Sequence, residues 1–403
     1  MDIYEPREDS TLLERYVKQY AKGYVLDMGT GSGVQAITAA KSKKVSSVLA
    51  TDIQDSIIEF NKKNINNKKI TFIVSDLFQT FKTNKKFDTI IFNPPYLPQE
   101  LKLKDLTLEG GKKGYEVLER FLDEVNDYLK PDGIILIVFS SLTKKEKVDE
   151  FIRNNLLEFK LLDKQHIFFE DLYVYKIEKS SILKSLEKKK IKNIKYLAKG
   201  KRGIIFIGKH DNKKIAIKIK NPESEAVLRT NNEINFLKVL NKKNIGPKLL
   251  FYDKDFLAYG FVEGISVSEF FASIKNNSMN KSNNEIDNLK NKKIALRLII
   301  KIMNQMYAMD KLKINKEEMS HPQKHILIDR KNNPILIDFE RAHHTIKPGN
   351  VTQFCDFLIS RYISIILKNN KIKINNKKII NAAKQYKKKQ NKENFNKIIK
   401  LIK

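Results

Sequence analysis

The sequence lacks several features that secreted and membrane proteins depend on. Cysteine occurs once in 403 residues, as Cys355, which excludes a disulfide framework and a self-contained cysteine-rich zinc or iron–sulfur site. The acidic start of the chain has no apolar segment typical of a signal peptide. No run of about 18 apolar residues is present that could span a bilayer. These absences predict a reducing, cytoplasmic location.

Charge is distributed unevenly along the chain, whose formal net charge is +30. Residues 1–180 contain 28 basic and 28 acidic residues, whereas residues 181–403 contain 49 basic and 19 acidic residues. Because typical domains have about 100–200 residues, we expect two modules joined near residue 180. The basic second half favours contact with RNA, the ribosome or another polyanion. Lysine is also the commonest solvated side chain, so the charge alone does not establish nucleic-acid binding.

The first half alternates short apolar runs with segments of helical spacing. This alternation predicts a parallel sheet covered by helices, a Rossmann-like doubly wound α/β domain over residues 1–178. The expected strands are 24–27, 48–52, 70–75, 89–92 and 134–139, and the expected helices are 34–41, 56–64 and 115–129.

The second half has a different pattern, which follows a lysine-rich stretch. We expect residues 179–193 to be a basic linker, residues 194–366 to be an α+β domain, and residues 367–403 to be a Lys/Asn-rich helical tail, partly frayed on the surface. Within the α+β domain the pattern predicts two hairpins, at 203–220 and 326–337, helices at 224–240 and 294–309, and a strand at 257–262.

A glycine-rich turn follows the first expected strand, at Gly29, Gly31 and Gly33. Glycines let the backbone approach a ligand closely and turn sharply into a helix. Such a loop fits NAD, FAD or S-adenosylmethionine equally well.

Three acidic residues narrow this choice to S-adenosylmethionine. Asp27 ends the strand before the glycines, where a carboxylate can hold the amino group of a methionine moiety. Asp52 ends the next strand, where it can bind ribose hydroxyls, and Asp76 ends the third, where it can reach an adenine amino group. All three lie at the carboxyl edge of the sheet, where open α/β sheets bind ligands.

The motif Asn93-Pro94-Pro95-Tyr96 follows the strand at 89–92 and indicates methyl transfer to a planar NH2 group. An amide or an aromatic amine is a poor nucleophile because its lone pair is delocalised. The Asn93 side-chain oxygen and the Pro94 carbonyl can each accept one N–H of that group, which aims the lone pair at the methyl donor. The prolines fix the turn, and Tyr96 offers a flat surface to the substrate.

Residues 1–180 resemble the HemK/PrmC-type class I methyltransferases, especially the short archaeal and eukaryotic branch. That resemblance implies S-adenosylmethionine as cofactor and, as substrate, the glutamine of the Gly-Gly-Gln loop in a class-1 release factor. It also implies a small zinc-ribbon activator subunit as partner. The opening motif, with Glu8, Asp9 and Ser10, lines the cofactor pocket in that family. The matching motifs are 4–10, 27–33, Asp52, Asp76-Leu77-Phe78, 93–96, 109–114 and 168–172.

Other acceptors stay open at this point. The Asn-Pro-Pro-Tyr motif is shared with adenine-N6 methylases of RNA and DNA, for which the basic second half would serve as a nucleic-acid anchor. A relative in the short branch is also linked to lysine methylation.

The second half contains an ordered series of residues that is typical of protein kinases. Gly200 and Gly203 precede a hairpin, Lys218 lies on its second strand, and Glu233 follows on the next expected helix. This is the arrangement that clamps ATP phosphates. Asp338, in Asp338-Phe339-Glu340, stands where kinases have a magnesium ligand.

The catalytic loop departs from the kinase pattern. Glu318 stands where kinases have the catalytic aspartate, as the expected base, and Gln323 stands where they have a metal-binding asparagine. Residues 194–365 resemble divergent archaeal Ser/Thr kinases related to the RIO and KEOPS-complex kinases. The resemblance implies a two-lobed domain that binds ATP with magnesium. The alternative is a pseudokinase that serves only as a docking module.

Overall fold

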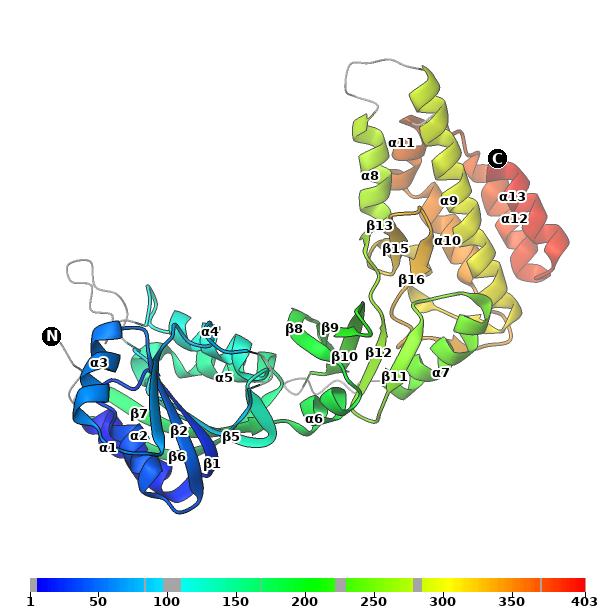
Figure 1. Cartoon of the computed structure of the whole chain (residues 1–403). Helices are drawn as coiled ribbons and strands as arrows, with labels where there is room; N and C mark the ends of the chain where they lie inside the picture. The colour runs from blue at the N-terminus through cyan, green and yellow to red at the C-terminus, as the bar shows by residue number, and fades with distance from the viewer. Residues whose placement is uncertain are drawn as a thin grey trace. The chain divides into compact units, whose positions relative to one another are not determined.

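The computed structural model describes residues 6–82, 85–96, 110–167, 169–221, 230–277, 285–369 and 372–402. The chain divides into two compact units, Met1–Tyr196 and Leu197–Lys403, each with its own sheet and core (Figure 1). The division falls inside the strand β8 (Lys192–Lys199). Where we expected a basic linker, the structure has this strand and the helix α6 (Ser181–Lys188).

Unit 1 is built on a seven-stranded sheet of order β3-β2-β1-β4-β5-β7-β6. Its first five strands pair in parallel and correspond to the five predicted from apolar runs. Two antiparallel strands, β6 and β7, extend the sheet beyond β5 and were not foreseen. The strands are β1 (Gly23–Met28), β2 (Val45–Asp52), β3 (Ile70–Val74), β4 (Phe87–Phe92), β5 (Leu129–Ser140), β6 (Leu157–Ile167) and β7 (Glu170–Lys179).

Helices cover both faces of this sheet. One face carries α1, α2 and α3, whose apolar side chains form a single core with alternate residues of the central strands, such as Val25, Ile91 and Leu136. On the other face Phe121 of α4 packs on Phe92, with ring centroids 4.6 Å apart. The helices are α1 (Glu8–Tyr20), α2 (Val34–Lys41), α3 (Asp55–Asn64), α4 (Glu116–Val125) and α5 (Lys145–Asn154), with a short η1 (Ser141–Thr143).

Unit 2 begins with a five-stranded sheet of order β11-β12-β10-β9-β8, antiparallel along its β9-β10-β12-β11 ladder. The predicted hairpin is formed by β9 and β10, and its turn residues Asp211 and Asn212 both have positive φ. The helix α7 contacts this sheet. The elements are β9 (Gly203–His210), β10 (Lys213–Lys220), α7 (Thr230–Leu240), η2 (Asn241–Lys243), β11 (Leu249–Tyr252) and β12 (Phe256–Gly260).

The remainder of unit 2 is mainly helical and carries two small sheets, β13-β15-β16 and β14-β17. Its long apolar helix α9 packs against α10. The elements are β13 (Gly264–Ser266), α8 (Val267–Asn277), α9 (Glu285–Lys311), β14 (Ile314–Asn315), η3 (Glu317–Ser320), η4 (Pro322–Lys324), β15 (Ile326–Asp329), β16 (Pro334–Leu336), β17 (His343–His344), α10 (Asn350–Ile359), α11 (Arg361–Asn369), α12 (Asn376–Lys388) and α13 (Lys392–Ile402).

The C-terminal residues are not the frayed surface tail that their lysine content suggested. Ile379 and Tyr386 of α12 and Phe395 and Ile398 of α13 are buried in the core of unit 2. Their spacing gives each helix one apolar face, while the lysines lie on the opposite face. Tyr386 also donates a hydrogen bond to the buried Asp310 of α9, at 3.0 Å.

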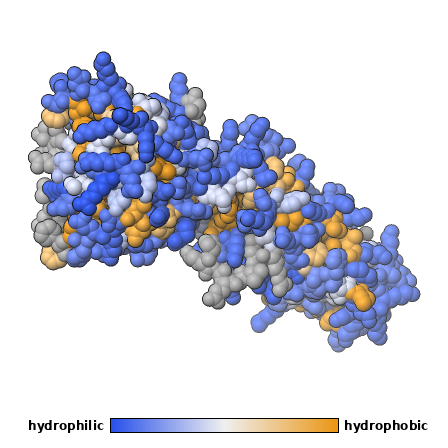
Figure 2. All heavy atoms as spheres, turned by 90° about the horizontal axis from the view of Figure 1, so that it is seen from below, coloured by the Kyte–Doolittle hydropathy of each residue, from blue (hydrophilic) through white to orange (hydrophobic). Residues whose placement is uncertain are grey.

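None of the helices in the described part of the chain is long and apolar enough to cross a membrane. The face seen in Figure 2 is largely hydrophilic, and hydrophobic side chains form only scattered patches on it.

Candidate active site

A cavity of about 260 Å3 lies where the parallel strands of unit 1 end. The strand register brings these ends together, because Met28 of β1 pairs with Thr51 of β2 on one side and with Phe92 of β4 on the other. The loops after β1, β2, β3 and β4 therefore meet at one edge of the sheet. Their residues, with the start of α1 and part of α4, line the cavity: Asp9, Ser10, 27–32, Val34, Gln35, 52–54, Ile57, 75–77, 92–96, Val117 and Arg120.

The glycine-rich loop closes one wall of the cavity. Gly31 has a φ of +50°, and its N–H donates to the Asp52 carboxylate at 3.0 Å. Gly33 has a φ of +79°, and a Cβ there would lie 2.6 Å from Ile65 Cδ1. Any larger residue at position 33 would therefore strain the backbone and clash with the Ile65 side chain. The helix α2 therefore begins directly beside the cavity.

Asp27 is a fully buried carboxylate at the base of the cavity, with no cation paired to it among the described residues. Burial raises its pKa to about 7, although hydrogen bonds from Thr30 Oγ1 at 2.6 Å and Ala36 N at 3.1 Å oppose that rise. Burial likewise raises the pKa of Asp52. A ligand that brings hydrogen-bond donors or positive charge would therefore stabilise the ionised form of both carboxyl groups.

Asp76 differs from these two acids because it already has a cationic partner. Its Oδ2 lies 2.8 Å from Arg120 Nη2, and both residues line the cavity. The pair is partly exposed, so its contribution to stability is small. It links the loop after β3 to α4 on the far wall.

The Asn93 side chain is held in one orientation by α1. Its Nδ2 donates to Asp9 Oδ2 at 3.0 Å and to Ser10 Oγ at 3.3 Å. A carboxylate accepts hydrogen bonds and does not donate them, so the NH2 end of the amide must face Asp9. The Oδ1 of Asn93 is buried and has no hydrogen-bond partner among the described residues. Since a buried unpaired acceptor is costly, a ligand that brings a donor to this oxygen would be stabilised.

Most of the residues predicted for the methyltransferase site line this cavity. They include the whole 93–96 motif, and Asp9, Ser10, Asp27, Gly29, Gly31, Asp52, Asp76 and Leu77. Two of the predicted residues do not line the cavity. Glu8 is exposed in the first turn of α1, and Gly33 is the residue that precedes α2 as its N-cap. Sequence reasoning missed Arg120 and Gln35, because no motif marks a helix residue that reaches the cavity from a neighbouring element; Thr30, which bonds Asp27, lies inside the predicted 27–33 motif but was not singled out.

In unit 2 the structure brings together the charged residues that the second motif series predicted. Lys218 Nζ lies 2.8 Å from Glu233 Oε2, 3.2 Å from Asp338 Oδ1 and 3.3 Å from Glu340 Oε2. Burial alone would lower the pKa of Lys218, but the carboxylates of Glu233 and Asp338 outweigh it and raise that pKa. Glu340 also pairs with Arg202 at 3.2 Å, from the turn before β9. Gly200 and Gly203 flank that turn, and their backbones pair at 2.8 Å.

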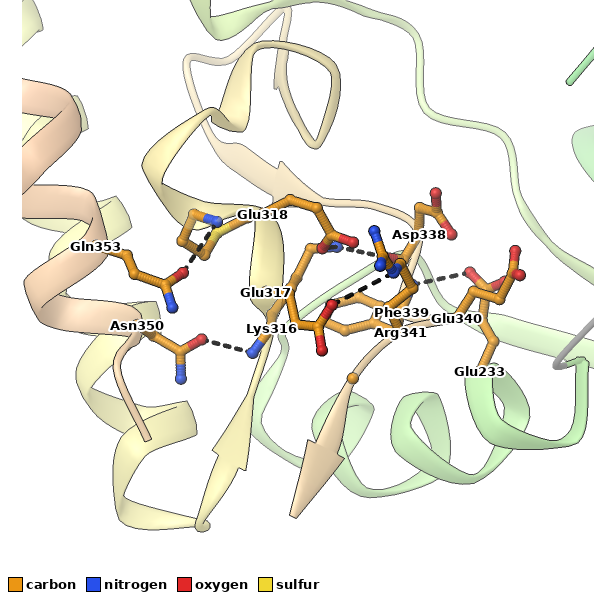
Figure 3. A network of polar contacts seen from close by, with 12 residues as sticks. Glu233, Lys316, Glu317, Glu318, Asp338, Phe339, Glu340, Arg341, Asn350 and Gln353 are labelled. Carbon is orange, nitrogen blue, oxygen red and sulfur yellow. Dashed lines mark hydrogen bonds and ion pairs between the residues drawn. The ribbon is translucent and has the colours of Figure 1, made fainter. Parts of the chain in front are cut away.

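Figure 3 shows how Asp338 is held from the other side, by Lys316. The Lys316 side chain is fully buried; its ammonium donates to the Asp338 backbone carbonyl and lies 3.3 Å from the Glu318 carboxylate. Asp338 has a φ of +63°, a left-handed conformation that few residues other than glycine adopt. Burial would raise the pKa of Asp338, but Lys218 and Lys316 outweigh it and lower that pKa.

Two residues predicted for the catalytic loop have surroundings that the sequence did not predict. Glu318, the expected base, forms an ion pair with Lys316. Gln323, the expected second metal ligand, lies on η4 and forms no hydrogen bond with Asp338 among the described residues. His325 interacts electrostatically with both Glu318 and Asp338, and burial lowers its pKa. The described residues contain no group of three His, Cys, Asp or Glu side chains that could hold a metal ion by itself.

The parallel sheet with its antiparallel end strands and the cavity at its carboxyl edge define unit 1 as a class I methyltransferase. The family model of the methyltransferase small domain matches residues 8–169. A Methanocaldococcus jannaschii protein named "Putative protein N5-glutamine methyltransferase" is 35% identical over 180 residues, which cover 43% of this chain and 90% of that relative. The chain belongs, through its first unit, to the HemK/PrmC-type glutamine methyltransferase family.

Two further relatives match this chain over different shares of their own length. The release factor glutamine methyltransferase of Bacillus cereus is 34% identical over 139 residues, which cover 31% of this chain and 49% of that protein. The chain thus spans about half the length of this bacterial relative. In the solved E. cuniculi Mtq2–Trm112 complex, described as responsible for methylation of the eRF1 translation termination factor, one chain is 27% identical. It is matched over its full length and over 45% of this chain, with a TM-score of 0.37.

Proposed function

We propose that unit 1 transfers a methyl group from S-adenosylmethionine to the side-chain amide nitrogen of a glutamine, in the Gly-Gly-Gln loop of a class-1 release factor. The observation that carries this proposal is the buried, unpartnered Oδ1 of Asn93, oriented by Asp9. An amide NH2 supplies the donor that this oxygen lacks. The names of two relatives, which specify glutamine methylation, support the choice of acceptor.

The cavity fits S-adenosylmethionine, which supplies an electrophilic methyl group when it is bound. Asp27 is a buried carboxylate without a cation and would bind the ammonium of the methionine moiety. Asp52 would accept hydrogen bonds from ribose hydroxyls while it keeps the glycine loop in place through Gly31. Asp76, fixed by Arg120, would bind the adenine amino group.

The motif after β4 would orient the acceptor. Asn93 Oδ1 and the Pro94 carbonyl accept the two N–H groups of the amide, and this places the nitrogen lone pair toward the methyl group. Because the amide of Asn93 is already fixed by Asp9 and Ser10, it needs no reorganisation during the reaction. Tyr96, which is half-buried beside this turn, would pack on the planar substrate.

We also propose that a small zinc-ribbon activator subunit binds the open edge of the sheet at β3. The edge strand β3 has a free side, on which another chain can add a strand. Phe60 of α3 and Val74 of β3 are exposed by 38% and 39%, and Ile53, in the loop after β2 that also lines the cavity, is exposed by 54%. A partner would bury these apolar side chains.

A methyl-transfer assay read by mass spectrometry tests the proposal. The full chain, with and without a zinc-ribbon partner, is incubated with S-adenosylmethionine, a release factor and total RNA as competing acceptors. The expected product is one methyl group on the Gly-Gly-Gln glutamine. Asn93→Ala should lower kcat about 100- to 1,000-fold, the usual effect of removing one such group. Methyl-adenine in the RNA, without methyl-glutamine, would instead establish the adenine-N6 alternative.

For unit 2 we propose a kinase-like domain that binds a nucleoside triphosphate with magnesium. The Lys218–Glu233 pair and the nearby Asp338 support this proposal, since a lysine held by an acid and facing a second acid suits a metal-bound phosphate. Magnesium is usually held by one or two carboxylates together with the phosphates, so Asp338 would suffice as its protein ligand. Glu318 would act as the base for a hydroxyl acceptor.

Calorimetric titration with ATP and magnesium tests this second proposal. Lys218→Met should reduce ATP affinity at least tenfold, and Asp338→Asn should abolish the contribution of magnesium. Glu318→Gln should leave binding intact and abolish any phosphate transfer to a protein acceptor. If ATP binds but transfer is absent in the unchanged chain too, unit 2 is a pseudokinase; if ATP does not bind, the proposal is wrong.

A further inference from the structure

A wide groove in unit 2 lies apart from the Lys218 cluster. It has a volume of about 980 Å3 and is lined by residues from the C-terminal end of α7, the strand β11, the helix α9 and the turn before β16. Lysine and amide side chains dominate its lining, and none of the lining residues is acidic. They are Lys238, Asn241, Asn244, Gly246, Lys248, Leu249, Leu250, Tyr252, Lys301, Asn304, Gln305, Asn333, Pro334 and Ile335.

The positive charge of this groove is not neutralised from within. Lys238, Lys248 and Lys301 are exposed, and none of them forms an ion pair with a carboxylate in the part of the chain that the structure describes. Lys301 Nζ is fixed by two neutral oxygens, Asn333 Oδ1 at 2.7 Å and the Asn332 carbonyl at 3.3 Å. These bonds orient the ammonium group, whose charge also helps to lower the pKa of the nearby Asp329 and is therefore partly balanced. Three exposed lysines along one groove, none of them in a direct ion pair among the described residues, suit a chain of phosphates.

The groove also contains an aromatic ring and several amide side chains. Tyr252 is 47% exposed, and the Lys238 ammonium lies 4.1 Å from its ring centroid. A second hollow adjoins this pair and is lined by Asn231, Asn235, Lys254 and Asp253 among others. Gln305 Nε2 donates to the Pro334 carbonyl at 3.0 Å, and its buried Oε1 has no hydrogen-bond partner in the part of the chain that the structure describes.

Together these groups match the parts of a single strand of nucleic acid. An exposed ring accepts a stacked base of any identity, and the lysine over it adds positive charge beside the phosphates. The unpartnered Gln305 oxygen can accept a base N–H, and the exposed Asn244 and Asn304 amides offer further donors and acceptors. A duplex would present phosphates but no free base faces, so it could not use the ring.

We propose that this groove is a binding site for single-stranded RNA. Lys238, Lys248 and Lys301 contact phosphates, Tyr252 stacks on a base, and Gln305 accepts a hydrogen bond from a base. The proposal concerns binding by unit 2 and does not depend on which group unit 1 methylates or on whether unit 2 binds ATP.

Fluorescence anisotropy of a labelled 12-nucleotide single-stranded RNA with the full chain tests the proposal. The triple variant Lys238→Gln, Lys248→Gln, Lys301→Gln should raise Kd at least tenfold at 100 mM salt. It should also reduce the slope of log Kd against log salt concentration by about 2, since each lost phosphate contact removes about 0.7 for a single strand. Tyr252→Leu, which keeps the charge, should raise Kd at least fivefold.

A matched control separates a site from general attraction. The triple variant Lys384→Gln, Lys388→Gln, Lys392→Gln removes the same charge from exposed positions of α12 and α13, and it should raise Kd less than twofold. Circular dichroism melting confirms that each variant is folded. Equal losses in both triple variants, no loss in Tyr252→Leu, or tighter binding of duplex RNA or of an acidic peptide would each overturn the proposal.

Discussion

The two units differ in whether the polar groups of their candidate sites already have partners within the protein. Among the described residues of unit 1, the Asp27 carboxylate has no cation beside it and Asn93 Oδ1 has no hydrogen-bond partner. In unit 2 every acid of the cluster around Lys218 is already paired with a lysine or an arginine, with distances of 2.8 to 3.3 Å. The first site presents groups that lack a partner, whereas the second satisfies its charges internally.

This difference has consequences for ligand binding. A buried group without a partner carries a free-energy penalty that the right ligand removes, so binding is strengthened. A cluster of paired charges gains less, because a phosphate must displace a carboxylate from the same cation. We therefore expect substitutions in unit 1 to weaken ligand binding or catalysis strongly, and at least one substitution in unit 2 to strengthen ligand binding.

The largest effect is expected for Asp27→Asn in unit 1. The amide oxygen of the substituted side chain can still accept from Thr30 and Ala36, since both bonds go to one oxygen of Asp27, but the amide has no charge for an ammonium group. Loss of one partner of a buried ion pair costs on the order of 3 kcal/mol. Calorimetry should show S-adenosylmethionine affinity falling by about 100-fold, with the melting temperature nearly unchanged.

The pH dependence of binding gives an independent check on Asp27. Because its pKa is raised to about 7 in the free protein, the carboxyl is protonated below pH 7 and must lose that proton to bind an ammonium group. The Kd of the unchanged chain should rise up to tenfold per pH unit as the pH falls from 7 toward 5. Asp27→Asn should lose this dependence, whereas Asp52→Asn should keep it. A Kd that is constant from pH 5 to 8 would contradict the assignment of Asp27.

A smaller effect is expected for Asp9→Asn, which tests the orientation of Asn93. An asparagine at position 9 can donate as well as accept, so the Asn93 amide can then turn its NH2 end toward the substrate. Release factor methylation should show kcat about tenfold lower, the effect of losing one hydrogen bond to a charged group. The Kd for S-adenosylmethionine should change less than threefold. Ser10→Ala, which removes the longer 3.3 Å bond, should have a smaller effect on kcat.

The sequence predicted the strands and turns of unit 1 because these are local signals. Apolar runs bounded by Asp27, Asp52 and the 93–96 motif fix where the parallel strands end, and parallel pairing then brings those ends to one edge. The antiparallel β6 was not predicted because it is an edge strand that is only partly buried, and a register shift between Leu161 and Asp163 interrupts its apolar alternation.

The sequence predicted contacts between distant elements only where a motif marks both residues, as for Lys218 with Glu233 and Asp338. Arg120 reaches Asp76 across 44 residues, and Glu340 reaches Arg202 across 138. No local pattern predicts these two pairs, because a lone arginine is typical of a solvated surface. The buried Lys316 was missed for the same reason: a lysine in a polar loop gives no sign that folding will enclose it.

The smallest effect, and the one of opposite sign, is expected for Glu340→Gln in unit 2. The Glu340 carboxylate contacts both Lys218 and Arg202, the two cations that would bind phosphates. Its removal frees positive charge while Glu233 and Asp338 still hold Lys218. If unit 2 binds a nucleotide as proposed, calorimetry should show ATP affinity about three- to tenfold higher than in the unchanged chain.

The control for this prediction is Asp338→Asn, which also removes a negative charge from Lys218 but takes away the proposed magnesium ligand. With magnesium present it should weaken ATP binding, so the two variants should move affinity in opposite directions. Weaker binding in Glu340→Gln, with the melting temperature preserved, would show that Glu340 helps to form the phosphate site. The contrast between the two units would then be lost, because both would depend on every one of their acids for ligand binding.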